Sequence, residues 1–288
     1  MGYMGGKYLV GPHLIAALVL HTSVDDLNDA VWCEPFCGSL ALTYHLLEVA
    51  TPRQLVLCDA NRCLVRLWER MVLDGWDPPD AVPTRVEFLV CKRSPDSLLR
   101  WRAVKDDPVT DDDFVKSDVF PRPVTPEWIA WVGLVASFRG GYLGQYEQNA
   151  TKVEWAMKTV RRIVERLRGV AERITFRCCD FARSLEGLPL ERCVVVCDPP
   201  YLQCTGYGGV IKKFDDELFW RRWLWQLAGR CADVFVCEYY HNAVLVGLDE
   251  SVVWTRVARH GWADRYSRDE KLKDCLMRIT PDSNKAPS

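Results

Sequence analysis

A strand-like run that ends in an acid, two prolines and a tyrosine is the first feature of this sequence with chemical potential. Residues 194–201 read VVVCDPPY, with Asp198 and Tyr201 on either side of the proline pair. A carboxylate and an aromatic ring at the end of a buried strand can accept hydrogen bonds from a ligand and stack on it. The simpler interpretation is a turn, because proline lacks the N–H group that a sheet needs. The other motifs decide between the two.

A second motif lies on a predicted strand-to-helix turn, EPFCGSLAL at residues 34–42. An acid, an aromatic residue and a glycine (Glu34, Phe36 and Gly38) suit a small ligand at the carboxyl edge of a parallel sheet, where glycine lets the backbone approach closely. The motif lacks the full dinucleotide fingerprint, so it does not indicate phosphate binding. An ordinary tight turn is the alternative.

A third motif, LVLCDANR at residues 55–62, ends the next predicted strand in Asp59. An acid about 20 residues beyond the glycine turn of a mononucleotide-binding unit can accept hydrogen bonds from ribose hydroxyls. Asp59 is also a good N-cap for the helix that follows. The two roles are compatible.

The composition indicates one large α/β domain, or one domain with an insertion, and a sizeable core. The chain has 288 residues, of which 49% are hydrophobic and 26% charged, and a formal net charge of −2. This net charge does not by itself indicate a nucleic-acid partner. Binding a nucleic acid would require a local basic face on the protein. The longest early apolar run, residues 14–20, is too short to span a bilayer, and no signal peptide is visible. The 13 cysteines have poor metal-ligand spacing. They predict reduced core residues in an intracellular protein without a metal.

Short apolar runs alternate with helical patterns and predict a mostly parallel sheet. The predicted strands are residues 30–36, 54–59, 173–178, 192–198, 232–239, 252–258 and 272–279. The predicted helices are residues 39–50, 61–76, 126–138, 152–169 and 216–231. A segment rich in proline, charge and glycine turns interrupts the pattern at 77–151 and is interpreted as an insertion.

Taken in order, the motifs resemble the Dam-like, D12 class of adenine-N6 DNA methyltransferases over nearly the whole chain. The matching stretches are YMGGKYLVGPHL, EPFCGSLAL, CDAN, FRGGYLGQY, CDFARSL, CDPPY and KLKDCLMRI. The resemblance implies a mostly parallel, Rossmann-like α/β sheet with a C-terminal antiparallel strand and an inserted, mainly helical target-recognition region. It divides the chain into a catalytic domain of residues 1–76 and 152–280, the inserted region 77–151 and a disordered tail, 281–288.

The resemblance also implies S-adenosylmethionine as cofactor and a flipped-out adenine in double-stranded DNA as substrate. The residues implied for the cofactor are Tyr3, Gly6, Lys7, Glu34, Phe36, Gly38, Asp59, Asp180 and Phe181. The implied catalytic motif is Asp198, Pro199, Pro200 and Tyr201. In it, the carboxylate and the Pro199 carbonyl would accept both hydrogens of the adenine amine, and the tyrosine would stack on the base. No metal or membrane is implied, and a cognate restriction endonuclease is a possible partner.

Two positions depart from the family pattern. Leu40 replaces the second glycine of the turn, so it either crowds the cofactor or rotates outward and packs. The segment EQNATKVEW after Tyr146 is shorter than the family's usual polar, aromatic stretch, so the target need not be GATC.

Basic residues in and after the insertion are the predicted DNA contacts. Those favoured are Lys92, Arg93, Arg139, Tyr142, Lys212 and Lys213, with Arg139 placed in a turn that could enter a groove. A second group lies on the later helix: Lys152, Lys158, Arg161, Arg162, Arg166 and Arg168. A solvated helix face explains the second group equally well.

Two other functions fit the motifs. A methyltransferase acting on cytosine N4, on RNA adenine or on a protein glutamine shares the general pattern, although glutamine enzymes more often carry Asn at position 198 and the insertion favours nucleic acid. A catalytically silent DNA-binding relative is favoured only by Leu40.

Overall fold

A single seven-stranded sheet organises the protein. The computed structural model describes residues 7–94, 124–137, 142–202, 214–257 and 273–281. The strands are β1 (Val31–Glu34), β2 (Gln54–Asp59), β3 (Ile174–Cys178), β4 (Cys193–Cys197), β5 (Asp233–Tyr239), β6 (Val252–Val257) and β7 (Lys273–Arg278). Their order across the sheet is β3-β2-β1-β4-β5-β7-β6. All seven predicted strands are therefore confirmed.

Five strands run parallel and β7 runs against them. The β1–β2, β1–β4, β2–β3 and β4–β5 pairs are parallel, whereas β7 pairs antiparallel with both β5 and β6. This confirms the predicted fold class. The order reverses between β1 and β4, and in open α/β sheets ligands bind at such a switch point, outside the carboxyl ends of the strands.

Alternate residues of each central strand enter different cores, because successive side chains of a strand point to opposite faces. One core contains Trp32, Leu55, Leu57, Val194, Val196 and Phe235. The other contains Val31, Cys33, Val56, Cys58, Val195 and Val234. Both faces of the sheet are thus buried, which explains the continuous apolar runs of the sequence.

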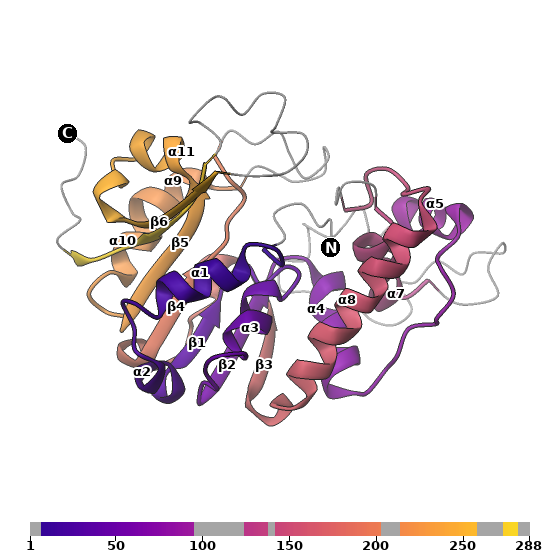
Figure 1. Ribbon diagram of the computed structural model, residues 1–288, viewed down its shortest axis with the longest axis horizontal. Helices are drawn as coiled ribbons and strands as arrows, with labels where there is room; N and C mark the ends of the chain where they lie inside the picture. The colour runs from indigo at the N-terminus through magenta and orange to yellow at the C-terminus, as the bar shows by residue number, and fades with distance from the viewer. Residues whose placement is uncertain (1–6, 95–123, 138–141, 203–213, 258–272, 282–288) are drawn as a thin grey trace.

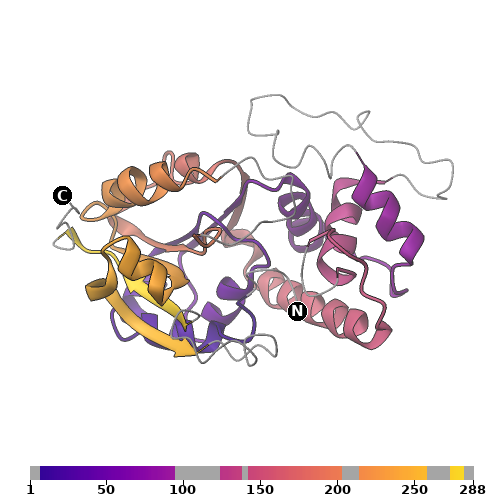
Figure 2. The same ribbon diagram turned by 90° about the horizontal axis from the view of Figure 1, so that it is seen from above.

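Helices cover both faces (Figure 2). The first core receives side chains from α1 (Gly11–Leu18), α3 (Ala41–Leu46), α4 (Arg62–Trp68), α5 (Arg85–Arg93), α7 (Pro126–Val135) and α8 (Ala150–Arg168). The second receives them from η7 (Phe219–Trp223), α10 (Leu224–Leu227) and α11 (Tyr240–Leu245). In Figure 1, α5, α7 and α8 gather at the end of the molecule beyond β3, on the side away from β6.

Several helices were not predicted. These are α1, α2 (Val24–Asp29), α5 and α11, all short. The N-terminus of α5 is a capping box, in which Thr84 and Glu87 bind each other's backbone N–H, but the prolines around it obscured that signal. The predicted helix 61–76 is α4 followed by the π-helical turn η1 (Glu69–Leu73), and the helix 216–231 is α9 (Asp216–Leu218), η7 and α10.

The described cysteines carry free thiols and most are buried, as predicted. Within the described ranges, no three His, Cys, Asp or Glu side chains gather as metal ligands would. The helices that the structure describes are all too short or too polar to cross a membrane.

Candidate functional site

Asp198 lies directly after β4, at the carboxyl edge of the sheet, and forms an ion pair with Lys7. The Lys7 Nζ to Asp198 Oδ1 distance is 2.7 Å, and the two side chains are only 6% and 17% exposed. Lys7 comes from the segment before α1, far from Asp198 in sequence. The structure thus brings Lys7 to the predicted catalytic carboxylate. The cofactor role that the resemblance implies for Lys7 stays a prediction.

The two charges of this pair support each other. Burial alone would lower the pKa of Lys7, but the attraction of Asp198 more than reverses that effect and the net pKa is raised. Burial raises the pKa of Asp198, and Lys7 counters part of the rise. Lys7 therefore favours the ionised form of Asp198 and opposes the effect of burial, which favours the neutral acid.

Tyr201 lies beside the same ion pair. The Lys7 Nζ is 4.6 Å from the centroid of the Tyr201 ring. Tyr239, at the end of β5, packs its ring edge-on against Tyr201 with centroids 4.7 Å apart. The Tyr201 hydroxyl is buried, and within the described residues it has no hydrogen-bond partner. The ammonium of Lys7, the carboxylate of Asp198 and the ring of Tyr201 thus lie close together at one place.

The segment that carries Lys7 is docked on α3. The Nε2 of His45 lies 2.8 Å from the Tyr8 carbonyl oxygen, and the Tyr8 ring stacks on Tyr44. Trp155 of α8 contacts the other edge of Tyr8. A Cβ atom at Gly11 would lie 2.3 Å from the His45 ring, so this docking needs a glycine there. No sequence motif predicted these contacts between Tyr8, α3 and α8.

Glu238 and Asn242 hold the residue that follows Tyr201, and sequence reasoning missed both. The Leu202 N–H donates to Glu238 Oε2 at 3.0 Å, and Asn242 Nδ2 donates to the Leu202 carbonyl at 2.9 Å. Glu238 Oε1 also accepts from Asn242 Nδ2 and from the Tyr239 N–H. Burial raises the pKa of Glu238 to about 7, although its three donors lower it.

The glycine turn is held by Asp59. Gly38 has φ +43°, a conformation that favours glycine, and its N–H donates to Asp59 Oδ2 at 3.0 Å. Asp59 Oδ1 accepts from the Asn61 N–H at 2.7 Å. Burial raises the pKa of Asp59 to about 6, although these donors lower it. The N-cap of α4 is Asn61, not Asp59, so that alternative for Asp59 was wrong.

Leu40 packs into the core. Its side chain is fully buried, yet its backbone is left-handed, with φ +58° and ψ +19°. This conformation costs a residue with a Cβ roughly 1–2 kcal/mol, and it explains why a glycine suits the position. Of the two expectations for Leu40, the structure supports packing and not crowding of the turn.

Glu34 is also engaged inside the protein. It accepts hydrogen bonds from Trp32 Nε1, at 2.9 Å, and from the Thr43 hydroxyl. Burial raises its pKa to about 7, against the effect of these two donors. Its side chain thus links β1 to α3 beneath the turn, and a role toward the cofactor stays a prediction.

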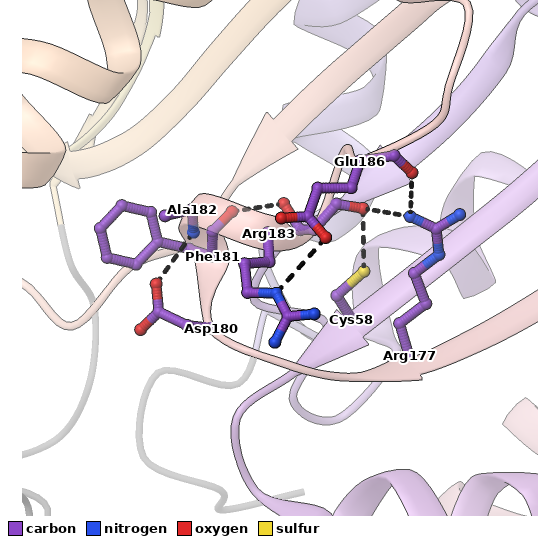
Figure 3. Close-up of polar contacts among 8 residues, drawn as sticks. Cys58, Arg177, Asp180, Phe181, Ala182, Arg183 and Glu186 are labelled. Carbon is purple, nitrogen blue, oxygen red and sulfur yellow. Dashed lines mark hydrogen bonds and ion pairs between the residues drawn. The ribbon is translucent and has the colours of Figure 1, made fainter. Parts of the chain in front are cut away.

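Asp180 and Phe181 follow β3 at the same edge. Asp180 caps the short 3-10 turn η5 (Phe181–Arg183), with Oδ1 accepting from the Ala182 N–H at 2.9 Å (Figure 3). Arg177 donates to the carbonyls of Ser184 and Glu186 and so fastens the rest of this turn to β3 (Figure 3). Phe181 is buried, and its ring stacks on Phe36 with centroids 5.7 Å apart.

The residues predicted to contact DNA have different surroundings in the structure, and some lie outside the described residues. Lys92 Nζ donates to the Gly144 carbonyl, which ties α5 to the turn after residue 141, while Arg93 is exposed. Tyr142 lies against α7, since a Cβ at Gly133 would be 2.5 Å from its ring. Tyr3, Gly6, Arg139, Lys212 and Lys213 lie outside the described residues.

The arginines of α8 mostly serve the fold. Arg161 pairs with Asp80, Arg166 pairs with Glu48, and Arg168 pairs with Asp77. Each also donates to a backbone carbonyl of another segment. Lys158 and Arg162 are exposed. Lys152 pairs with Glu147. The DNA contact and the solvated face both stay predictions for this group.

Comparison with known proteins supports the resemblance. No curated protein matches the chain. The family model of the D12 class N6 adenine-specific DNA methyltransferases matches residues 3–99, about a third of the sequence. This part carries Lys7, the glycine turn and Asp59. The predicted resemblance is confirmed there: over residues 3–99 the chain matches the D12 class N6 adenine-specific DNA methyltransferases, which are enzymes.

Proposed function

We propose that this protein transfers a methyl group from S-adenosylmethionine to the N6 amine of an adenine flipped out of double-stranded DNA. The observation that carries the proposal is the convergence of Lys7, Asp198 and Tyr201 at the carboxyl edge of β4, beside the β1 turn. The family match points to the same chemistry. An intracellular location belongs to the proposal.

The β1–β3 half of the edge fits the cofactor. Asp59 and Asp180 end or follow neighbouring strands, and Gly38, which has no Cβ, would let the backbone approach a ligand closely. Each carboxylate oxygen has two lone pairs, so Asp59 can accept ribose hydroxyls while it keeps its bonds to Gly38 and Asn61. The cofactor would supply an electrophilic methyl group.

The β4 half fits the amine. The lone pair of an adenine amine is delocalised into the ring, so the nitrogen is a poor nucleophile. Asp198 and the Pro199 carbonyl can accept its two hydrogens and direct the lone pair outward, and Tyr201 can stack on the base. Lys7 engages Oδ1 of Asp198 and favours its ionised form. The carboxylate then stabilises the positive charge that develops on the nitrogen.

The test is incorporation of tritiated methyl groups into duplex DNA, followed by chromatography of the nucleosides. We expect N6-methyladenine. N4-methylcytosine, or methylation of RNA in preference to DNA, would replace the proposal with the corresponding alternative. Binding of S-adenosylmethionine and DNA without transfer would indicate a silent relative.

A further inference from the structure

We propose that Glu238 and Asn242 are positioning residues for the methyl transfer, because they clamp both backbone groups of Leu202 and so fix the Asp198–Tyr201 segment against β5. The inference rests on the proposed function and adds two residues to its machinery. Within the described part of the chain, neither side chain forms a hydrogen bond with Asp198 or Tyr201. Both act through the backbone of Leu202.

The clamp is complete and buried. Glu238 and Asn242 are both 0% exposed, and together they satisfy the N–H and the carbonyl of one residue. They also bind each other, with Asn242 Nδ2 3.0 Å from Glu238 Oε1. Such mutual contacts restrict the rotamers of both side chains, so the position of Leu202 is defined by two rigid groups rather than by solvent.

The proline pair explains why a clamp is needed at this point. Pro199 and Pro200 have no N–H, so the segment after β4 cannot be anchored by backbone donors at those positions. Tyr201 and Leu202 are the first residues beyond the prolines with an N–H, and at Leu202 both backbone groups are bound by side chains. Fixing it determines the direction of the Pro199 carbonyl and of the Tyr201 ring, whose geometry the reaction needs.

A second acid on the same strand shows that the fold alone does not require this arrangement. Asp233, at the start of β5, also accepts several hydrogen bonds, but its partner is a cation: Arg278 donates to it at 2.7 Å. Glu238 lies at the end of β5. Its hydrogen bonds within the described residues all come from amide N–H groups. A buried carboxylate without a cation is costly. The donors that offset this cost include the Leu202 N–H, which points to a positional role.

The experiment compares Glu238→Gln with Asp233→Asn as a matched control on the same strand. A glutamine keeps the shape but turns an amide N–H₂ toward donors that need an acceptor. We expect kcat for DNA methylation, normalised to folded protein, to fall about 10- to 100-fold, with the KM for DNA and the calorimetric affinity for S-adenosylmethionine changed less than about threefold. Asp233→Asn should lower the melting temperature but keep kcat.

Hydrogen exchange gives a readout that does not depend on activity. The Leu202 amide should exchange faster in Glu238→Gln than in wild type and in Asp233→Asn. Asn242→Leu removes the contact with the Leu202 carbonyl and the bond to Glu238 Oε1, but it leaves the bond from the Leu202 N–H to Glu238. It should show a smaller fall in kcat, and it decides the matter if Glu238→Gln does not fold. Equal kcat and equal exchange in the Glu238 and Asp233 variants would overturn the clamp. An inactive wild type would overturn the proposed function instead.

Discussion

The two halves of the carboxyl edge use their carboxylates differently. In the β1–β3 half, Asp59 and Asp180 accept backbone N–H groups of neighbouring turns. In the β4 half, Asp198 is paired with the ammonium of Lys7. The first arrangement fixes the shape of a backbone turn, and the second orients a carboxylate and favours its charged form. We therefore expect changes in the first half to alter cofactor affinity and stability together, and changes in the second half to alter turnover.

The largest expected effect is that of Asp198→Asn. The substitution keeps the shape of the side chain but removes the negative charge that stabilises the developing ammonium, so kcat should fall about 10²- to 10⁴-fold. Affinity for S-adenosylmethionine, measured by calorimetry, should be nearly unchanged.

Asp198→Ala is less informative, because it removes the carboxylate of a buried ion pair, and breaking such a pair costs about 3–5 kcal/mol. Methyl incorporation must therefore be normalised to folded protein. Near-normal activity in folded Asp198→Asn would remove the carboxylate from the mechanism and leave the proline motif as a simple turn.

The second effect concerns Asp59 and pH. Its folded-state pKa, about 6, lies above the ordinary value of 3.8, so protonation stabilises the folded state. That contribution is fully present below the unfolded pKa and is lost as pH rises through about 6. A shift of about two pKa units corresponds to roughly 3 kcal/mol.

Urea unfolding of wild type and Asp59→Asn between pH 4 and pH 8 measures this contribution. The stability of wild type relative to the variant should decrease as pH rises, and the variant should bind S-adenosylmethionine about 1–3 kcal/mol more weakly. The other buried carboxyls are common to both proteins and cancel. A pH-independent difference would show that Asp59 titrates normally.

The third effect separates packing from backbone strain at Leu40. Leu40→Gly removes a buried side chain, at a cost of about 2–5 kcal/mol, but relieves about 1–2 kcal/mol of left-handed strain. The net loss of unfolding free energy should be about 1–4 kcal/mol. Leu40→Ala, which keeps the strain, should lose about 1 kcal/mol more. Tighter cofactor binding by a fully stable Leu40→Gly protein would restore the crowding interpretation.

The smallest effect is expected at Tyr201. Tyr201→Ala should weaken binding of an extruded base by about 1–3 kcal/mol, the scale of base–aromatic stacking. Tyr201→Phe should be nearly neutral, since the hydroxyl has no partner among the described residues. The readout is the KM for DNA together with kcat. A large loss in the phenylalanine variant would mean that the hydroxyl, and not the ring, contacts the substrate.

The sheet could be predicted from the sequence because strands buried on both faces produce continuous apolar runs, and charged or proline residues end them at one edge. That logic located Gly38, Asp59 and Asp198 before any coordinates. It did not locate α1, because this helix has only eight residues. Its stability comes from packing on α3 rather than from a hydrophobic periodicity of its own.

The contacts between distant segments could not be predicted in the same way. Lys7 was recognised from its motif, but its pairing with Asp198 depends on how α1 docks, through Tyr8 and His45. Glu238 resembled any acid at the end of a strand, and only the geometry of Leu202 distinguishes it. Leu40 was recognised as unusual, yet the choice between its two explanations needed its backbone angles.

The ion pair between Lys7 and Asp198 can form only late in translation. The ribosome makes Lys7 about 190 residues before its partner, and β5 is flanked by β7, which is made later still. Until Asp198 has been made, the Lys7 ammonium cannot form this ion pair. A nascent chain that already carries β1, β2 and β3 can therefore form the half of the edge with Asp59 and Asp180, whereas the half with Asp198 also needs β4, β5 and β7 and is completed only near the end of translation.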